Sequence, residues 1–173
     1  FTKILYIYLR RPDNCMSLNS VPYEKTLRIL QQVELFEHVP TNVIEELCKK
    51  MLISSFRAED RIINQGDEGN SMYVILSGKV HIHDGDFVVA SLHEGSFFGE
   101  FSLLDDEPRS LSVSAATPCV TGTILQNDFY RIINKYPDVT KDIIKVMLKR
   151  LRGQNTTIIA QLRSRQRELE NMV

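Results

Sequence analysis

The sequence predicts a mainly β protein of the α+β class: a double-stranded β-helix, or jelly roll, flanked by N-terminal helices and a long C-terminal helix. Two observations predict this fold. Between residues 53 and 125, short runs rich in β-branched residues alternate with glycine-containing turns, as is typical of jelly rolls. On both sides of this region, apolar residues recur at helical spacing instead. At 173 residues, 43% of them hydrophobic, the chain can bury a core without disulfides or metals.

Two helices are predicted ahead of the β region. Residues 22–36 carry apolar side chains at steps of three and four, with Pro22 at the start, where proline is tolerated. A second helix is predicted to begin at Thr41, whose hydroxyl we expect to cap it. It ends near Lys49 and Lys50, whose positive charge suits a helix C-terminus.

Six strands are predicted next, from β-rich runs bounded by turn residues. They lie at residues 61–64, 72–77, 79–84, 87–92, 111–115 and 120–125. In the third strand, Val80 and Ile82 alternate with His81 and His83. We therefore expect the two histidines on the solvent face and the aliphatic pair in the core.

Two helices follow the β region, at residues 127–134 and from Pro137 to about residue 171. In the long helix, apolar residues recur at steps of three and four, interrupted by Asn155 and Arg165, which predicts a helix–helix interface. We expect a homodimer whose buried seam comprises Leu148, Leu151, Ile158, Leu162 and Leu169. Between residues 143 and 167 there are seven basic residues and no acidic one, which we interpret as a solvated face rather than a nucleic-acid contact.

The chain is expected to divide into three parts. Residues 1–34 form an N-terminal helical extension, and residues 35–136 form the jelly roll with its flanking helices. Residues 137–173 form the C-terminal helix, a lid and dimerisation element.

Cysteine usage and charge bear on the compartment and on partners. Cys15, Cys48 and Cys119 are odd in number, far apart and without C-x-x-C spacing. This favours a reducing cytoplasmic setting and argues against an iron–sulfur or structural zinc site. A net charge of −1 gives no general attraction to nucleic acid or anionic membranes. A start at Phe1 rather than Met indicates a fragment of a longer protein, such as the cytoplasmic domain of a membrane protein.

The segment FFGEFSLLDDEPRSLSV, residues 97–113, holds the candidate site. A helix start after Gly99 would present backbone N–H groups to an anion, and glycine lets that anion come close. Arg109 adds a forked, permanently charged donor for a phosphate oxygen, whereas an ionised Glu100 can only accept and so suits sugar hydroxyls. The pattern fits a small anionic sugar phosphate. On residue types alone, the two charges could equally form a surface ion pair worth about 0–1 kcal/mol.

This segment resembles the phosphate-binding cassette of the cyclic nucleotide-binding domain family. The family includes regulatory subunits of cAMP-dependent protein kinase, cyclic-nucleotide-gated channels and bacterial catabolite activator proteins. The matching positions of the cassette are Gly99, Glu100, Phe101, Ser102, Leu103, Pro108, Arg109, Ser110 and Val113. An upstream frame also fits the family: Gly66, Asp67, Gly69, Tyr73 and Gly78. The resemblance covers roughly residues 35–152.

The resemblance implies a sensor that is not an enzyme, needs no cofactor and binds a 3′,5′-cyclic mononucleotide. The implied ligand-binding residues are Phe98, Gly99, Glu100, Phe101, Ser102, Arg109, Ser110 and Leu111. Counting from Pro137 implies base contacts from Gln154 and Asn155 on a helix that closes over the ligand. The hydroxyl of Ser110 leaves cAMP and cGMP both open, and we favour cAMP.

Two positions depart from the family pattern. Glu59-Asp60 stands where a Gly-Glu turn is usual, and we expect this to alter only a turn. Leu111 replaces a small residue two places after Arg109, so its side chain either narrows the pocket or points into the core.

Alternatives to a regulatory sensor remain open at this point. A metal-binding cupin also has a jelly roll and would use His81 and His83, but Phe87 and Val88 stand where its carboxylate ligand should fall, so we expect no metal site. We expect an effector attached outside this chain, and no direct nucleic-acid binding, because no helix-turn-helix fits before Val173. The runners-up are a fragment of a transcription regulator and a degenerate, non-binding interaction domain.

Overall fold

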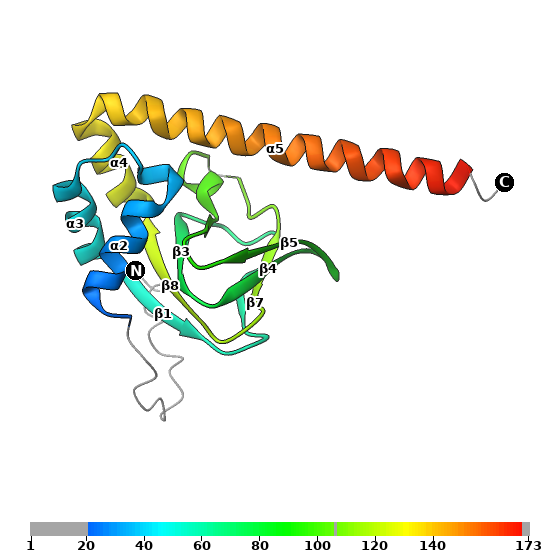
Figure 1. The fold of residues 1–173 in the computed structure, drawn as a ribbon, viewed down its shortest axis with the longest axis horizontal. Coiled ribbons are helices and arrows are strands. Elements are labelled where there is room, and N and C mark those ends of the chain that lie inside the picture. Colours follow the sequence, from blue (N-terminus) through cyan, green and yellow to red (C-terminus); the bar gives the residue numbers. More distant parts are fainter. Residues whose placement is uncertain (1–20, 106, 171–173) are drawn as a thin grey trace.

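The computed structural model describes residues 21–105 and 107–170, and it confirms the jelly roll (Figure 1). In this part of the chain, eight strands form two antiparallel four-stranded sheets, in the orders β1-β8-β3-β6 and β2-β7-β4-β5. The strands are β1 (Leu52–Phe56), β2 (Arg61–Ile63), β3 (Ser71–Ser77), β4 (Lys79–Asp84), β5 (Phe87–His93), β6 (Phe97–Phe98), β7 (Ser112–Ala115) and β8 (Cys119–Leu125).

All six predicted strands are confirmed, each to within one residue at either end. The sequence analysis missed β1 and β6. β1 pairs along its whole length with β8, but most of its side chains are exposed, so its sequence lacks the alternation that marks a half-buried strand. β6 consists of two residues paired with β3, which is too short for any periodicity.

Helices cover one face of the first sheet (Figure 1). The helices of the described residues are α2 (Tyr23–Gln32), α3 (Thr41–Lys50), α4 (Gln126–Lys135) and α5 (Pro137–Glu170), with the short 3₁₀ helices η1 (Glu34–Phe36) and η2 (Glu100–Leu103). The prediction of one helix over residues 22–36 is wrong at Val33, whose extended backbone (φ −66°, ψ 122°) separates α2 from η1. Thr41 is the first residue of α3 rather than its cap: Pro40 holds the cap position, and no described side chain caps this end.

The long helix α5 packs against η1 and α4 near its start and then runs past the roll (Figure 1). Its side chains are described up to Gly153 and at Arg163 and Arg167. Of the helices in the described residues, none combines the length and the apolar character needed to cross a membrane.

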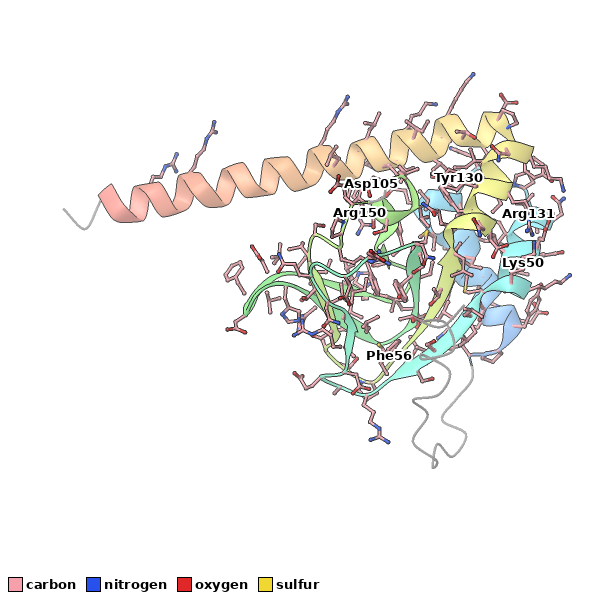
Figure 2. All side chains as sticks on the ribbon, turned by 180° about the vertical axis from the view of Figure 1, so that it is seen from behind. Lys50, Phe56, Asp105, Tyr130, Arg131 and Arg150 are labelled. Atoms are coloured by element: carbon pink, nitrogen blue, oxygen red, sulfur yellow. The ribbon has the colours of Figure 1, made fainter. Side chains whose placement is uncertain are left out.

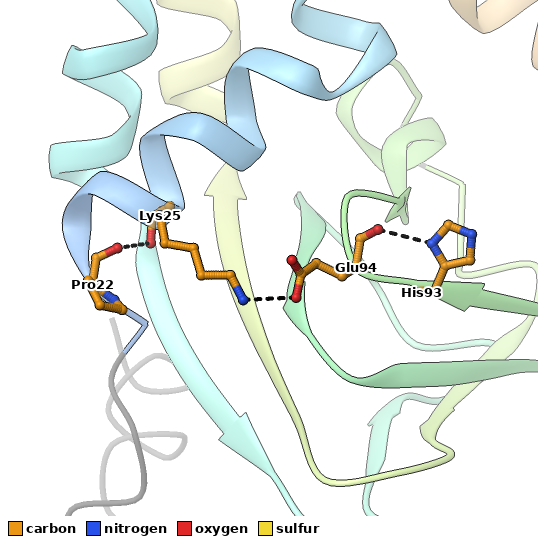
Figure 3. Close-up of polar contacts among 5 residues, drawn as sticks. Pro22, Lys25, His93 and Glu94 are labelled. Carbon is orange, nitrogen blue, oxygen red and sulfur yellow. Dashed lines mark hydrogen bonds and ion pairs between the residues drawn. The ribbon is translucent and has the colours of Figure 1, made fainter.

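An ion pair links the N-terminal helical region to the roll (Figure 3). The Lys25 ammonium on α2 lies 2.9 Å from a carboxylate oxygen of Glu94, in the turn between β5 and β6. The backbone carbonyl of Glu94 also lies 3.0 Å from Nδ1 of His93. Because both side chains of the ion pair are nearly half exposed, the link adds little stability on its own.

The strands β3 and β6 separate two hydrophobic clusters. Along β3, Met72, Val74 and Leu76 point toward the helices, whereas Ile75 points into the roll. β6 repeats the pattern, since Phe97 belongs to the helix-side cluster and Phe98 to the interior of the roll. The candidate site begins directly after β6, so it starts at the boundary between the two clusters.

Strand β4 shows the predicted alternation. Val80 is fully buried and Ile82 packs against the cluster inside the roll. The histidines on the other face are half-buried rather than fully solvated, because each contacts a serine hydroxyl: His81 Nδ1 lies 2.9 Å from Oγ of Ser91, and His83 Nε2 lies 2.6 Å from Oγ of Ser114.

The turn before β2 contains a strained residue. Glu59 has φ of +70°, a left-handed conformation that costs a non-glycine residue about 1 kcal/mol or more. The turn is fixed on both sides, since Glu59 N–H donates to the Ala115 carbonyl (2.8 Å) and Asp60 accepts from the Arg57 N–H (2.7 Å). Glu59, which stands where the family usually has glycine, therefore keeps the turn but adopts a strained backbone conformation.

Replacing Glu59 with glycine should stabilise the protein by about 1 kcal/mol, because glycine adopts a positive φ without a Cβ clash. Urea denaturation followed by circular dichroism measures the free energy of unfolding. Glu68→Gly is the matched control: Glu68 is also exposed but is not among the positive-φ residues, so glycine there should bring no gain. Equal effects of the two substitutions would contradict the assignment of strain to Glu59.

Candidate ligand-binding site

The candidate site is built around a glycine turn that follows β6. Gly99 has φ of +76° and stands directly before η2. A Cβ on Gly99 would lie 2.6 Å from Nη1 of Arg109, and a Cβ on Gly69 would overlap the Nε and Cζ atoms of the same guanidinium. Both glycines are therefore required by their close approach to Arg109, which connects the upstream glycine frame to the cassette.

Arg109 lies in the interior and is only 7% exposed. Its Nη1 donates to the Gly99 carbonyl (2.9 Å), and its Nη2 donates to the carbonyl (2.7 Å) and hydroxyl (3.3 Å) of Ser71. Burial lowers the pKa of Arg109, while Tyr73 and Glu100 act in the opposite direction. An arginine guanidinium in a protein stays protonated at neutral pH, so the site contains a buried positive charge.

Backbone hydrogen bonds hold Arg109 against the glycine frame. The Arg109 N–H donates to the Asp67 carbonyl, and the Gly66 N–H donates to the Arg109 carbonyl, each at 2.8 Å. Arg109 thus joins three segments: its backbone bonds to the loop after β2, and its guanidinium bonds to the start of β3 and to Gly99 after β6.

Glu100, the first residue of η2, is buried to 2% exposure. Its Oε1 lies 3.0 Å from Nε of Arg150 on α5, but no described residue donates a hydrogen bond of acceptable geometry to Oε1. Burial raises the pKa of Glu100, and the charges of Arg150 and Arg109 oppose that rise. The carboxylate therefore combines an ion-pair partner with an acceptor atom that lacks an aligned donor.

The remaining predicted residues fall into three groups. Phe98 is buried and stacks on Tyr73, with ring centroids 5.1 Å apart, and Ser102 is buried beside Glu100 in η2. Phe101 and Leu111 are half-buried, and Ser110 is exposed. The side chains of Gln154 and Asn155 lie outside the described residues.

The sequence analysis missed three residues at the site: Ser71, Tyr73 as a site residue, and Arg150. Ser71 and Tyr73 contact Arg109 from β3, the latter with its ring centroid 5.9 Å from the guanidinium carbon. The interpretation of the basic run on α5 as a solvated face is wrong for Arg150, whose guanidinium lies 4.3 Å above the Phe97 ring. No local signal in the sequence separates Arg150 from the other basic residues of this run.

Comparisons of the sequence with known proteins identify a family and several relatives. The family model for the cyclic nucleotide-binding domain matches residues 53–136. The chain is 35% identical over 133 residues to a cAMP-dependent protein kinase regulatory subunit of Candida albicans, covering 72% of this chain and 29% of that protein. It is 27% identical over 127 residues to a cGMP-dependent protein kinase of Eimeria tenella, covering 73% of this chain and 13% of that protein.

A solved structure gives the same result. The co-crystal structure of the regulatory domain of Toxoplasma gondii PKA with cAMP matches with a TM-score of 0.61 and 27% identity, over 67% of this chain and 46% of that one. The chain spans less than a third of the length of the two curated relatives. Residues 53–136 of this chain form a domain of the cyclic nucleotide-binding family.

Proposed function

We propose that this chain is a regulatory, non-catalytic sensor that binds a 3′,5′-cyclic mononucleotide between Arg109 and Glu100. The observation that carries the proposal is that the same cassette holds two buried groups: the Arg109 guanidinium, and the Glu100 Oε1 atom, which lacks an aligned donor. A buried acceptor without a hydrogen bond is costly, and a sugar hydroxyl would supply the missing donor.

Arg109 can take the phosphate. The hydrogen bonds within the described residues use Nη1 and Nη2 but not Nε, and a guanidinium has five N–H groups. Charged hydrogen bonds to a phosphate in a buried site are among the strong ones. In this arrangement Glu100 accepts from the ribose 2′-hydroxyl, and the backbone of Gly99 to Ser102 lies beside the ligand.

We favour cAMP over cGMP as the ligand. The relatives include proteins named for either ligand, but the regulatory subunit from Candida albicans, named for cAMP, is 35% identical, whereas the kinase from Eimeria tenella, named for cGMP, is 27% identical. Ser110, next to Arg109, is exposed, and its hydroxyl can serve either ligand.

Titration calorimetry with cAMP, cGMP and 5′-AMP tests the proposal. We expect cAMP to bind more tightly than cGMP, and 5′-AMP, whose phosphate is not cyclised to the ribose, to bind much more weakly than either. Absence of binding by both cyclic nucleotides at millimolar concentration would contradict the proposal. That result would favour the alternative, a degenerate domain kept for protein interaction.

We also propose that occupancy controls an effector attached to this domain, and that the protein works in a reducing, cytoplasmic compartment. The first point is supported by the two relatives, a regulatory subunit of a protein kinase and a protein kinase, because the chain covers only 29% and 13% of them. Free, buried Cys48 and Cys119 support the second. A fragment of a transcription regulator remains the second candidate.

Homodimerisation through α5 is a further part of the proposal. Ile144, Leu148 and Leu151 lie at helical spacing on α5 and are 43% to 47% exposed, and an exposed apolar stripe favours a partner. The other members of the predicted seam, Ile158, Leu162 and Leu169, have side chains outside the described residues.

The double substitution Leu148→Asp and Leu151→Asp should convert a dimer to a monomer at tens of micromolar, because it places four carboxylates, two from each chain, in an apolar seam. Sedimentation velocity measures the change. The double substitution Lys141→Gln and Lys145→Gln on the same helix controls for charge, because it also lowers the net charge by two and both lysines are exposed. A wild-type chain that sediments as a monomer would exclude the dimer, and an unchanged dimer in the leucine variant would exclude this seam.

A further inference from the structure

The first residue of β3, Ser71, contacts the Arg109 guanidinium with two different groups. Its backbone carbonyl accepts from Nη2 at 2.7 Å, and its side-chain hydroxyl lies 3.3 Å from the same nitrogen. Ser71 is 7% exposed, and among the described residues Arg109 is the one hydrogen-bond partner of its hydroxyl. The hydroxyl therefore serves the guanidinium rather than solvent or another segment.

Ser71 belongs to a well-fixed part of the roll. It pairs with Leu125 of β8, and β3 lies inside its sheet, between β8 and β6. Two residues further along β3, the Tyr73 ring centroid lies 5.9 Å from the Arg109 guanidinium carbon. Side chains two apart on a strand share a face, so β3 presents both Ser71 and Tyr73 to Arg109 from a rigid element.

The other charged residue of the cassette is held by a different part of the molecule. Glu100 lies 3.0 Å from Arg150 of α5, and Figure 2 shows Asp105, in the loop just after η2, close to the course of α5. The hydrogen bonds of the Arg109 guanidinium, within the described part of the chain, go instead to Gly99 and to β3. The orientation of Arg109 is therefore set by the roll and not by the long helix.

These hydrogen bonds leave a defined set of donors for a ligand. A guanidinium has five N–H groups, one on Nε and two on each Nη. The carbonyl and the hydroxyl of Ser71 together use both N–H groups of Nη2, and the Gly99 carbonyl uses one on Nη1. One N–H on Nε and one on Nη1 remain. Without the Ser71 hydroxyl, an N–H of Nη2 would also be free, and a phosphate could bind in more than one orientation.

We propose that Ser71 is a positioning residue: its hydroxyl occupies the second N–H of Nη2, so that the cyclic phosphate meets only the N–H groups on Nε and Nη1. The inference rests on the proposed function. It implies that the domain distinguishes the two exocyclic oxygens of the phosphate, because they are not equivalent to a guanidinium whose orientation is fixed.

Titration calorimetry with the two phosphorothioate analogues of cAMP, Sp-cAMPS and Rp-cAMPS, tests this role. In each analogue, sulfur replaces a different exocyclic oxygen, and sulfur is the weaker hydrogen-bond acceptor. Wild type should bind one analogue about tenfold or more tightly than the other. Ser71→Thr keeps the hydroxyl and should keep this ratio within a factor of about two. Ser71→Val has the shape of threonine without the hydroxyl, and its ratio should be about threefold smaller than that of wild type, or less.

The ratio of the two affinities separates positioning from a structural effect. A general loss of stability weakens the binding of both analogues alike and leaves their ratio unchanged, and any strain from the added methyl group is shared by the threonine and valine variants. If these two variants do not fold, Ser71→Ala, which also lacks the hydroxyl, is compared directly with wild type and should show the smaller ratio.

The outcomes separate the inference from the proposed function. A wild-type chain that binds cAMP but does not discriminate between the analogues overturns the positioning role and leaves the sensor function intact. Equal ratios in the threonine and valine variants overturn it as well. Absence of wild-type binding to cAMP and to both analogues overturns the positioning role and the sensor function together.

Discussion

Replacing Arg109 with alanine should weaken cAMP binding by about a hundredfold or more, because it removes charged hydrogen bonds in a buried site that are worth about 3 kcal/mol together. Arg109 is 7% exposed and also bonds to Gly99 and Ser71, so the variant should unfold at lower urea concentration as well. Calorimetry at a temperature where both proteins are fully folded measures affinity apart from stability. Arg109→Lys should recover little, since an ammonium does not reproduce the forked geometry.

The control for this experiment is Arg61→Ala. Arg61 is exposed on β2, so its loss changes the net charge by the same amount without touching the cassette. Its affinity should stay within a factor of about two of wild type. An Arg109→Ala variant that binds cAMP within threefold of wild type would contradict the placement of the phosphate on Arg109.

Replacing Gly69 with alanine should have the second largest effect. The new Cβ would overlap the Arg109 guanidinium, so the guanidinium must move or the loop must shift. Overpacking of this kind costs about 1–3 kcal/mol of stability, and displacement of Arg109 should also weaken cAMP binding about tenfold. Thermal denaturation and calorimetry measure the two effects.

Gly153→Ala is the matched control for Gly69. Gly153 is inside α5, and apart from its chain neighbours and the backbone of its own helix, nothing in the described part of the chain lies within 4 Å of a Cβ placed there. Alanine should therefore stabilise the helix by about 0.5–1 kcal/mol. A Gly69→Ala variant with wild-type stability and affinity would show that Arg109 is not confined by this glycine.

Most strands were predictable because their patterns are local. In β4, alternation of Val80 and Ile82 with two histidines fixes both the strand and its buried face. Val33 shows the limit of local reasoning: its apolar side chain fits a helical row, yet its extended backbone ends α2 and its side chain is fully buried in the helix-side cluster. Tertiary packing overrides helical spacing at that residue.

The site was predictable where the motif carries it and not where it depends on distant contacts. Gly99, Glu100 and Arg109 come from the cassette, and the structure brings them together. Arg150 could not be found in this way, because its burial depends on how α5 lies over η2 and Phe97. In a list of basic helical residues, nothing local distinguishes it from Lys149, which is exposed.

The most direct test of the account is a calorimetric comparison of cAMP with 2′-deoxy-cAMP, on the wild-type chain and on Glu100→Gln. The account predicts that wild type binds cAMP about tenfold or more tightly than the deoxy analogue, because the analogue cannot donate to the buried Glu100 carboxylate. In the Glu100 variant this difference should shrink. Equal affinity of wild type for the two nucleotides, or no binding of cAMP at millimolar concentration, would contradict it.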